Sequence, residues 1–566
     1  MKDTSGKKGK LLRGAEIIVE TLIEQGVTHV FGYPGGYIID TFDALYLYRD
    51  KIKQILTSHE QGACHAADGY ARATGRVGVV MSTSGPGATN LVTGIATAYM
   101  DSVPLVAITG NVPLTSLGRD SFQEVDITGV TMPITKHNFI VKDVSELAST
   151  LRQAFEIAAS GRPGPVLVDV PKNVQQAVAE YVPASPVQKR VEPLKIDEQA
   201  REAAQILSQA KKPLIYAGGG VIISNACEKL REFAEKFGAP VASSMMGLGA
   251  MPANHPLFLG MLGMHGSAAV AKALGECDAV IAIGARFSDR VAGNPKNFCK
   301  NAKIIHIDID SAEVDKIVNS HAHIIGDALQ ALDWLTENAK PHPNSEWQQR
   351  CAELKKQYPF IDSKMPLCPR KLLRALAKFS PADRIVTTDV GQHQMWAAQS
   401  YPVSVPRTFL TSGGLGTMGY GLGAALGAAV ATKKPVTLIT GDGSFHMNMN
   451  ELPTCVKNGL EVKIFVFNNN VLGMVRQWQT LFYNKHYSST TLDSPTDYVK
   501  LAEAFGAKGL TLDRNENIES VVKTAFSTRG TVVVDCKIMP DEFVLPMIPA
   551  GKSAEDIITE IKEANE

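Results

Sequence analysis

Residues 436–448 read VTLITGDGSFHMN, an apolar run that stops abruptly at a carboxylate between two glycines. The run has the length and β-branched content of a buried strand. Residues 462–470, VKIFVFNNN, repeat the pattern and end in three asparagines. In open parallel sheets, ligands bind at the carboxyl ends of the strands. The two stretches therefore predict neighbouring strands whose ends present oxygen atoms to a cationic ligand.

The rest of the chain follows the same alternation of strands and helices. Short apolar runs such as VGVVMST (77–83), AVIAIGARF (279–287) and TVVVDCKI (531–538) recur between stretches with helical periodicity. This pattern predicts βαβ units, and hence an α/β fold of three consecutive parallel-sheet domains. We place the domains at 11–182, 196–345 and 369–548, linkers at 183–195 and 346–368, and tails at 1–10 and 549–566.

The composition is typical of a globular enzyme in the cytoplasm. The 566 residues carry 57 Lys and Arg against 57 Asp and Glu, so no overall field attracts nucleic acid or an anionic membrane. The eight cysteines form no C-x-x-C pair, which favours reduced thiols. The basic N-terminus lacks the apolar segment of a secretory signal. The uncharged stretch 408–432 is rich in Gly and Ala, which predicts a loop leading into a buried helix rather than a membrane span.

A second motif, Gly414-Leu-Gly416-Thr-Met-Gly419, has the G-x-G-x-x-G spacing of a dinucleotide fingerprint. Asp442 lies roughly where such a fingerprint places its ribose-binding acid, about 20 residues further on. A ribose-binding acid, however, needs no glycine on either side. Glycine-rich turns into Ala-rich helices also arise from close packing. From the residues alone, both interpretations of the motif stay open.

Asp442 and the asparagines at 468–470 are better explained as a metal site. Mg²⁺ prefers oxygen ligands, commonly one or two from protein together with phosphate and water. Two ordinary turns are the alternative, because Asp-Gly and Asn-Asn are common turn formers. The position of both groups at the ends of two successive strands favours a site for Mg²⁺ and a diphosphate.

Gly441-Asp442-Gly443 followed by Asn468-Asn469 resembles the signature of the thiamine diphosphate-dependent decarboxylases and carboligases. The resemblance implies the three-domain fold of that family, with Mg²⁺ held by Asp442, Asn469 and Val471. It also implies that the diphosphate lies against Gly391, Gln392, His393, Gly443 and Ser444, and the aminopyrimidine ring against a loop containing Gly416 and Met418. If the resemblance holds, the glycine motif does not bind a nicotinamide dinucleotide.

An acidic residue in the first domain extends the resemblance. In QILTSHEQGACHAADGYAR (54–72), Glu60 starts a predicted helix directly after a strand. The family's H-E-x-x-A pattern implies that this carboxyl exchanges a proton with the aminopyrimidine ring. On its own, Glu60 is a first-turn acid that complements a helix dipole. Since the two halves of the site come from different chains in this family, the resemblance implies at least a homodimer.

Longer stretches narrow the resemblance to the acetohydroxyacid (acetolactate) synthases. They are Phe31–Gly36, Ser84–Asn90, Ser121–Asp126, Gly161–Val166, Arg286–Arg290 and Leu472–Trp478, with departures from the usual residues at Ser288 and His446. The resemblance implies decarboxylation of pyruvate on thiamine diphosphate and transfer of the hydroxyethyl unit to pyruvate or 2-ketobutyrate. The products, 2-acetolactate and 2-aceto-2-hydroxybutyrate, lead to valine, leucine and isoleucine.

The same resemblance assigns roles to the remaining residues. It places Gly36, Gln123 and Lys172 near the reacting groups, Phe122, Met264, Arg290 and Trp478 near the substrates, and Arg162, His265, Arg286, Asp308 and Asp327 at FAD. The alternatives are a catabolic acetolactate synthase without FAD, a pyruvate oxidase with a redox-active flavin, and a cofactor-binding module without catalysis. Binding of a small regulatory subunit is left open.

Overall fold

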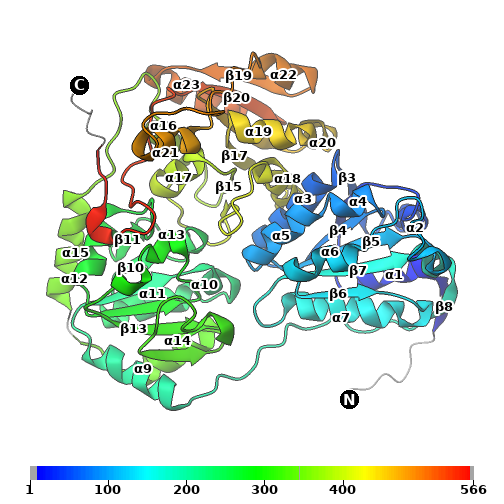
Figure 1. Cartoon of the computed structure of the whole chain (residues 1–566), viewed down its shortest axis with the longest axis horizontal. Coiled ribbons are helices and arrows are strands. Elements are labelled where there is room, and N and C mark those ends of the chain that lie inside the picture. Colours follow the sequence, from blue (N-terminus) through cyan, green and yellow to red (C-terminus); the bar gives the residue numbers. More distant parts are fainter. Residues whose placement is uncertain (1–8, 343, 561–566) are drawn as a thin grey trace.

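The computed structural model describes residues 9–342 and 344–560. It contains three six-stranded sheets, one in each third of the chain, and their strands pair in parallel (Figure 1). The predicted α/β fold of three consecutive parallel-sheet domains is confirmed. The N-terminal domain (blue to cyan) lies beside the middle domain (green), and the C-terminal domain (yellow to orange) contacts both.

The N-terminal domain has the strand order β3-β2-β4-β5-β7-β6. Its elements are α1 (Gly14–Glu24), β2 (His29–Gly32), α2 (Ile39–Leu47), β3 (Lys53–Leu56), α3 (Glu60–Thr74), β4 (Gly78–Ser82), α4 (Pro86–Thr89), α5 (Val92–Met100), β5 (Leu105–Asn111), α6 (Ile127–Thr131), β6 (His137–Ile140), α7 (Leu147–Ala159), β7 (Pro165–Pro171) and α8 (Lys172–Gln176). A separate antiparallel pair joins β1 (Lys10–Arg13) to β8 (Val178–Tyr181).

The middle domain has the strand order β11-β10-β9-β12-β13-β14. Its elements are α9 (Glu198–Gln209), β9 (Pro213–Ala217), α10 (Gly219–Ile223), α11 (Cys227–Phe237), β10 (Val241–Ser243), β11 (Phe258–Met261), α12 (Ala268–Glu276), β12 (Ala279–Ile283), α13 (Asp289–Ala292), β13 (Lys303–Asp308), β14 (Ala322–Ile325), α14 (Ala328–Asn338) and α15 (Ser345–Gln357). Counted within the domain this is the order 3-2-1-4-5-6 of the dinucleotide-binding doubly wound sheet, whose crevice opens between its first and fourth strands.

The C-terminal domain has the strand order β16-β15-β17-β18-β20-β19. Its elements are α16 (Pro369–Lys378), β15 (Ile385–Thr388), α17 (Gln392–Ser400), β16 (Phe409–Leu410), α18 (Tyr420–Thr432), β17 (Val436–Gly441), α19 (Asp442–Asn448), α20 (Leu452–Lys457), β18 (Val462–Asn468), α21 (Gly473–Phe482), α22 (Tyr498–Ala504), β19 (Lys508–Leu512), α23 (Ile518–Ser527) and β20 (Val532–Lys537). Counted within each domain, the first and third sheets share the order 2-1-3-4-6-5.

Helices α3 and α18 join the N- and C-terminal domains, and one hydrophobic core runs through both. Their backbones approach closely because glycines face the neighbouring helix. A Cβ atom on Gly427 would lie 1.8 Å from the carbonyl oxygen of Ala66, and one on Gly69 would lie 2.2 Å from that of Ala424. The Gly/Ala content of 408–432 therefore serves close packing, and the predicted buried helix is confirmed. Within the described ranges, no helix has both the length and the hydropathy needed to span a bilayer.

Two segments outside the predicted domains are ordered on the middle domain. The segment 346–368, expected to be a linker, begins with most of α15, whose Trp347 is buried and donates a hydrogen bond to the carbonyl of Pro213 at 2.9 Å. In the expected tail, Ile558 pairs with Met547, and just before the tail the backbone of Ile548 donates to the carbonyl of Met264 of the middle domain at 2.7 Å. The part of this tail at 561–566 lies outside the described residues.

Candidate active site

The ends of β17 and β18 meet as the sequence predicts. These strands pair in parallel with Gly441 opposite Phe467, so the residues that follow them lie at one edge of the sheet. The backbone N–H of Asn470 donates to Oδ2 of Asp442 at 2.7 Å. Asn470 has φ +56°, which turns the chain between Asn469 and Val471. The chain reversal brings the three predicted metal ligands together.

The environment of Asp442 suits a cation. Its carboxylate is buried, and the hydrogen bonds that it accepts from described residues come from the backbone N–H groups of Gly443 and Asn470. Burial raises the pKa of Asp442 to about 6, since no cationic side chain offsets the loss of water. Nearby, Oδ1 of Asn468 is buried without a hydrogen-bond partner among the described residues. A hard divalent ion would supply the missing positive charge.

The donor set fits Mg²⁺ together with phosphate rather than a metal held by protein alone. In the described part of the chain, no three His, Cys, Asp or Glu side chains lie close enough to hold a metal. The edge offers the carboxylate of Asp442, the amide of Asn469 and the backbone at Val471. Mg²⁺ completes its near-octahedral shell with waters and substrate phosphates. A diphosphate bound at this edge therefore fits the site.

The residues predicted to line the diphosphate lie at two helix starts: Gly391, Gln392 and His393 at the start of α17, and Gly443 and Ser444 in the first turn of α19. Cβ atoms at Gly391 and Gly441 would each lie 2.9 Å from the ring of His393, so both positions require glycine. Burial lowers the pKa of His393 to about 3, which keeps the ring neutral, and its Nε2 lacks a partner among the described residues. Ser444 Oγ donates to the carbonyl of Val390 at 2.9 Å.

Gln392 lies at the same helix start, but its side chain is engaged elsewhere. Its Nε2 donates to Oε1 of Gln477 at 3.1 Å and to the carbonyl of Glu542 at 2.9 Å. Its Oε1 accepts from Nδ2 of Asn469 at 3.3 Å. The Gln392 side chain thus fixes the orientation of Asn469, and only its backbone is available to a phosphate.

The glycine motif does not form a dinucleotide site. The N–H of Gly414 donates to Oδ1 of Asp101 at 2.7 Å, and the N–H of Gly419 donates to Oδ1 of Asp389 at 2.7 Å. The donors that a pyrophosphate would need are therefore bound by carboxylates of the protein. Gly416, with φ +70°, and Met418 face a large cavity instead.

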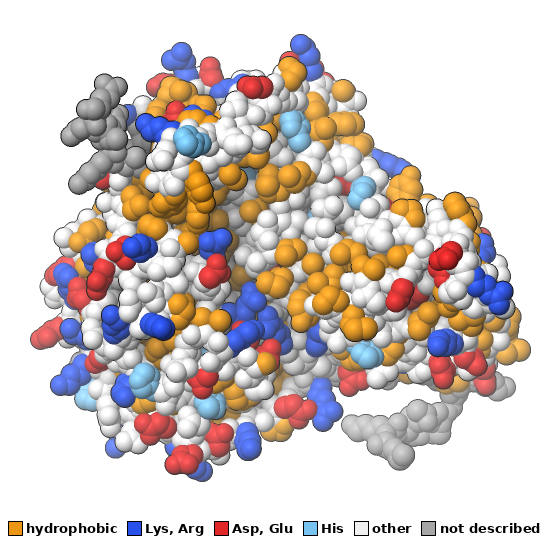
Figure 2. All heavy atoms as spheres, in the orientation of Figure 1, with side chains coloured by type: hydrophobic (Ala, Val, Ile, Leu, Met, Phe, Trp, Pro, Cys, Tyr) orange, Lys and Arg blue, Asp and Glu red, His pale blue; other side chains and the backbone are white. Residues whose placement is uncertain are grey.

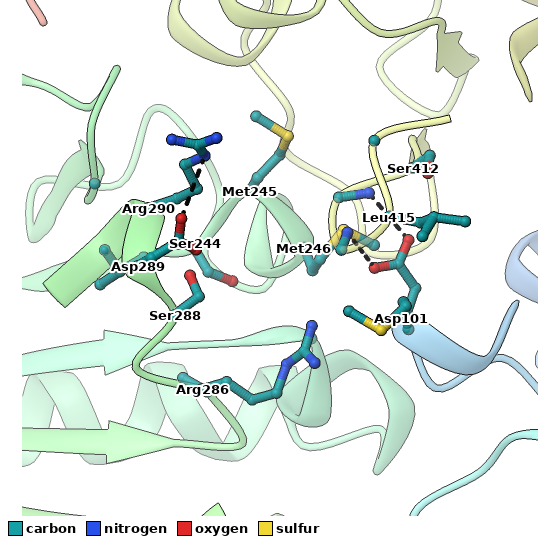
Figure 3. Close-up of a pocket in the computed structure, with 18 of the residues that line it drawn as sticks. Asp101, Ser244, Met245, Met246, Arg286, Ser288, Asp289, Arg290, Ser412 and Leu415 are labelled. Carbon is teal, nitrogen blue, oxygen red and sulfur yellow. Dashed lines mark hydrogen bonds and ion pairs between the residues drawn. The ribbon is translucent and has the colours of Figure 1, made fainter. Parts of the chain in front are cut away.

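This cavity, of about 1390 Å³, lies where the three domains meet (Figure 3). It exceeds the roughly 300–1,000 Å³ of a pocket for one small ligand, so it has room for more than one. All five residues predicted to contact FAD line it, namely Arg162, His265, Arg286, Asp308 and Asp327. They lie toward the carboxyl edge of the doubly wound middle sheet, where that fold binds dinucleotides.

The fit to a dinucleotide rests on the crevice itself. Gly218 and Gly284 follow β9 and β12, the two strands at which the order of the sheet reverses. A Cβ on Gly218 would lie 2.1 Å from the carbonyl oxygen of Gly284, so the close approach of the two strand ends requires glycine at 218. Elsewhere in the same cavity, beyond β11, Nδ1 of His265 is buried without a partner in the described ranges. Arg162, in contrast, already pairs with Asp310 and Glu313, at 3.2 and 2.8 Å.

Three predicted substrate residues, Met264 and Arg290 of the middle domain and Trp478 of the C-terminal domain, come together in the same cavity. Arg290 is on α13 of the middle domain, and Trp478 is on α21 of the C-terminal domain. The guanidinium carbon of Arg290 lies 6.0 Å from the ring centroid of Trp478, and its Nη1 lies 3.8 Å from Sδ of Met264. A cation beside an apolar wall can bind a short carboxylic acid by both of its ends.

The remaining predicted residues form a second group in the N-terminal domain. Glu60 starts α3 after β3, and its Oε2 accepts from Nδ2 of Asn90 at 2.9 Å. Lys172 Nζ donates to the carbonyl of Gly36 at 3.0 Å. Gln123 has φ +60°, a costly conformation for a non-glycine residue that is enriched at functional sites. Together with the exposed Phe122, this group does not line the large cavity.

Sequence reasoning missed three residues that shape these groups. Asn90 lies within the quoted Ser84–Asn90 stretch, but only the fold shows that it binds Glu60. Gln477 precedes Trp478 and had no predicted role, but its side chain accepts a hydrogen bond from Gln392. Asp101 carries no motif at all, and the two backbone N–H groups that it accepts from, those of Gly413 and Gly414, are over 300 residues away in the sequence.

Comparisons with known proteins agree with this arrangement. Models of thiamine pyrophosphate enzymes match residues 12–130 (N-terminal TPP binding domain), 200–335 (central domain) and 389–536 (C-terminal TPP binding domain). Acetolactate synthase of Arthrospira platensis is 45% identical over 571 residues, 97% of this chain and 98% of the relative. The acetolactate synthase isozyme 2 large subunit of Escherichia coli K12 is 46% identical over 559 residues, 97% and 100%. The probable acetolactate synthase large subunit of Methanocaldococcus jannaschii is 46% identical over 571 residues, 97% and 96%.

The three domains and the cofactor edge define a thiamine pyrophosphate-dependent enzyme. Within that class, the chain belongs to the acetolactate synthase family.

Proposed function

We propose that this chain is the catalytic subunit of an acetolactate synthase that joins pyruvate to pyruvate or to 2-ketobutyrate, giving 2-acetolactate or 2-aceto-2-hydroxybutyrate. One observation carries the proposal. The C-terminal domain carries both the buried sheet edge at Asp442, which suits Mg²⁺ and a diphosphate, and Trp478. The guanidinium of Arg290 lies against the ring of Trp478. Both products are precursors of the branched-chain amino acids.

The chain's own residues hold the cofactor and manage its proton. When bound, thiamine diphosphate supplies an acidic carbon and an electron sink for the decarboxylation of a 2-keto acid. Asp442, Asn469 and Val471 hold Mg²⁺, and Gly391, His393, Gly443 and Ser444 line the diphosphate. Glu60 exchanges a proton through the carboxyl oxygen that Asn90 leaves free, Oε1.

The acceptor is held at both ends. The planar guanidinium of Arg290 binds its carboxylate, and the apolar face of Trp478 packs against its alkyl group. Gly36, Gln123, Lys172, Phe122 and Met264 border the path of the substrates. A larger acceptor covers more of the indole and therefore binds more tightly, because each buried methylene contributes about 0.8 kcal/mol.

Trp478→Leu should reduce the preference for 2-ketobutyrate over pyruvate as acceptor by about tenfold, since one methylene in an apolar pocket is worth about 1–3 kcal/mol. The measurement is the ratio of the two products when both acceptors compete. Trp334→Leu, a half-buried tryptophan on α14, is the matched control and should leave the ratio unchanged. An unaltered ratio in Trp478→Leu would contradict the pocket assignment.

FAD occupies the middle-domain crevice in this proposal. The strand order and the glycine-lined mouth support it. The net reaction passes no electrons to an acceptor, so the flavin serves structure rather than redox chemistry. A pyruvate oxidase would differ, because pyruvate would bleach its flavin at the rate of turnover.

Two copies of the chain complete each site. The Glu60 group lies apart from the large cavity, and Phe122 is 79% exposed in the single chain. Figure 2 shows hydrophobic side chains gathered on the face of the N-terminal domain. Exposed apolar surface of this kind marks an interface.

We also propose a small regulatory partner, because two of the relatives described above are named large subunits. We propose a cytoplasmic location as well, because all eight cysteines are free.

An acetolactate assay tests the reaction. Purified protein with pyruvate, Mg²⁺, thiamine diphosphate and FAD should form 2-acetolactate, detected as acetoin after acid decarboxylation. Activity that depends on FAD and favours 2-ketobutyrate supports the biosynthetic enzyme. Activity without FAD would indicate the catabolic one. Pyruvate consumed without acetolactate would contradict the proposed reaction.

A further inference from the structure

The loop that carries the glycine motif, residues 413–419 (the glycine loop), is held from the N-terminal domain. We propose that Asp101 is a positioning residue that fixes the glycine loop for cofactor binding, through a buried charge network on α3 and α5. The inference rests on the proposed function, since it assumes that this loop lies against the cofactor.

Asp101 binds the start of the loop with both carboxylate oxygens. It directly follows α5, and its side chain is fully buried. Oδ2 accepts from the N–H of Gly413 at 3.0 Å and Oδ1 from the N–H of Gly414 at 2.7 Å (Figure 3). Hydrogen bonds to an ionised acceptor are about twice as strong as neutral ones. One side chain thus fixes two successive peptide units of another domain.

Arg72 places the Asp101 carboxylate and connects it to the far end of the loop. Its Nη2 donates to Oδ2 of Asp101 at 2.9 Å, and its Nε donates to Oδ1 of Asp68 at 2.6 Å. Oδ1 of Asp68 also accepts from the hydroxyl of Tyr420 at 2.7 Å. Tyr420 begins α18, immediately after the glycine loop. The network therefore holds the chain on both sides of the loop.

A third contact lies between these two. The hydroxyl groups of Thr97, on α5, and Thr417 are 2.7 Å apart and buried. The N-terminal domain thus contacts the loop at its beginning, near its middle and just after its end. Asp68 and Arg72 are on α3, the helix that starts at Glu60. One helix therefore carries both the proposed proton-exchanging carboxyl and part of the loop's support.

The loop needs such support because its own residues supply little. Gly413–Gly416 are exposed, and three of the four are glycines without side chains to pack. Glycine loses more conformational freedom on ordering than any other residue. With the anchor removed, the loop would sample other conformations and the cofactor would have to order it on binding. The cost then appears as lower cofactor affinity.

The test is Asp101→Asn, which keeps the shape but removes the charge and turns one acceptor into a donor. The dissociation constant for thiamine diphosphate, measured by calorimetry with Mg²⁺ present, should rise at least about tenfold, as expected for weakened charge-assisted bonds. The KM for pyruvate at saturating cofactor should change little, although the Tm of the cofactor-free protein falls because Arg72 loses a buried counter-charge. This split separates positioning from general stability.

Asp278→Asn is the matched control. Asp278 also accepts from two successive backbone N–H groups, of Lys211 and Lys212, both at 2.8 Å, but in the middle domain away from the glycine loop. Its variant should bind thiamine diphosphate as the wild type does. Equal losses of affinity in both variants, or none in Asp101→Asn, would overturn the inference.

Thr97→Val keeps the test decisive if Asp101→Asn does not fold. It removes the contact with Thr417 together with the hydrogen bond that the Thr97 hydroxyl donates to the carbonyl of Thr93 within α5. The dissociation constant should rise about threefold, as expected for loss of a neutral hydrogen bond to the loop; an unchanged value would overturn the inference. Wild-type protein is assayed alongside for acetolactate. If the wild type forms acetolactate but the variants bind thiamine diphosphate as tightly as the wild type, only the inference about Asp101 is rejected. If the variants bind more weakly but the wild type forms no acetolactate, only the proposed reaction is rejected.

Discussion

Glu60→Gln should lower kcat for acetolactate formation by about 100-fold or more, while thiamine diphosphate still binds within a few-fold of wild type. Proton transfer by a positioned side chain contributes typically 10²- to 10⁴-fold. Glutamine can keep the hydrogen bond from Asn90 only through its carbonyl oxygen, and it cannot take up a proton. Steady-state kinetics at saturating cofactor and calorimetric binding give the two values.

The alternative interpretation of Glu60, a first-turn acid that complements a helix dipole, has its own control. Glu198 is the first-turn acid of α9 and is exposed. Glu198→Gln should leave kcat unchanged. Near-normal turnover in Glu60→Gln would remove this carboxyl from the chemistry.

Asp442→Ala should weaken Mg²⁺ and thiamine diphosphate together by at least about 100-fold. Removing one partner of a buried charge pair costs about 3–5 kcal/mol, because the other charge is left uncompensated. Titrations of each ligand in the presence of the other measure the coupling. Asp383→Ala, in the same domain but paired with Lys434 at the surface, should change neither affinity. Unchanged binding of both ligands to Asp442→Ala would reject the metal site.

The pH dependence of Mg²⁺ binding follows from the same carboxyl. Burial raises the pKa of Asp442 to about 6, so below that pH a proton competes with the ion. Mg²⁺ affinity in the wild type should therefore fall as the pH is lowered through 6. The raised pKa also means that ionised Asp442 destabilises the metal-free fold. The free energy of unfolding of the metal-free protein should therefore fall as the pH rises from about 4 to 6. Affinity that stays constant between pH 7 and 5 would contradict the assignment.

The chemistry at the strand ends was predictable because it depends on local patterns. A buried strand ends where its apolar run ends, and the carboxyl ends of parallel strands share one edge, so Asp442 and Asn469 were expected on the same edge of a sheet; that they lie side by side depends on the direct pairing of β17 with β18. Strand order was not predictable in this way, since it depends on pairings between distant segments. The shared order of the first and third sheets, and the doubly wound order of the middle sheet, emerge only from the structure.

The helix α15 and the anchor at Asp101 were missed for different reasons. In α15, Trp347, Cys351 and Leu354 have helical spacing and are buried, but polar residues and nearby prolines dominate that stretch. Asp101 binds the glycine loop through peptide groups rather than side chains, and almost any residue type can supply those. Such contacts leave no trace in composition or spacing.

A hybrid of two variants tests the central claim, that Glu60 and Asp442 of different chains act on one cofactor. Co-expressed, differently tagged Glu60→Gln and Asp442→Ala chains are purified as the mixed dimer. If the sites are shared, one site of the hybrid carries both lesions and the other carries none, so about half of the wild-type kcat should return. If each chain builds its own site, both sites are damaged, and a hybrid as inactive as its parents would contradict the account.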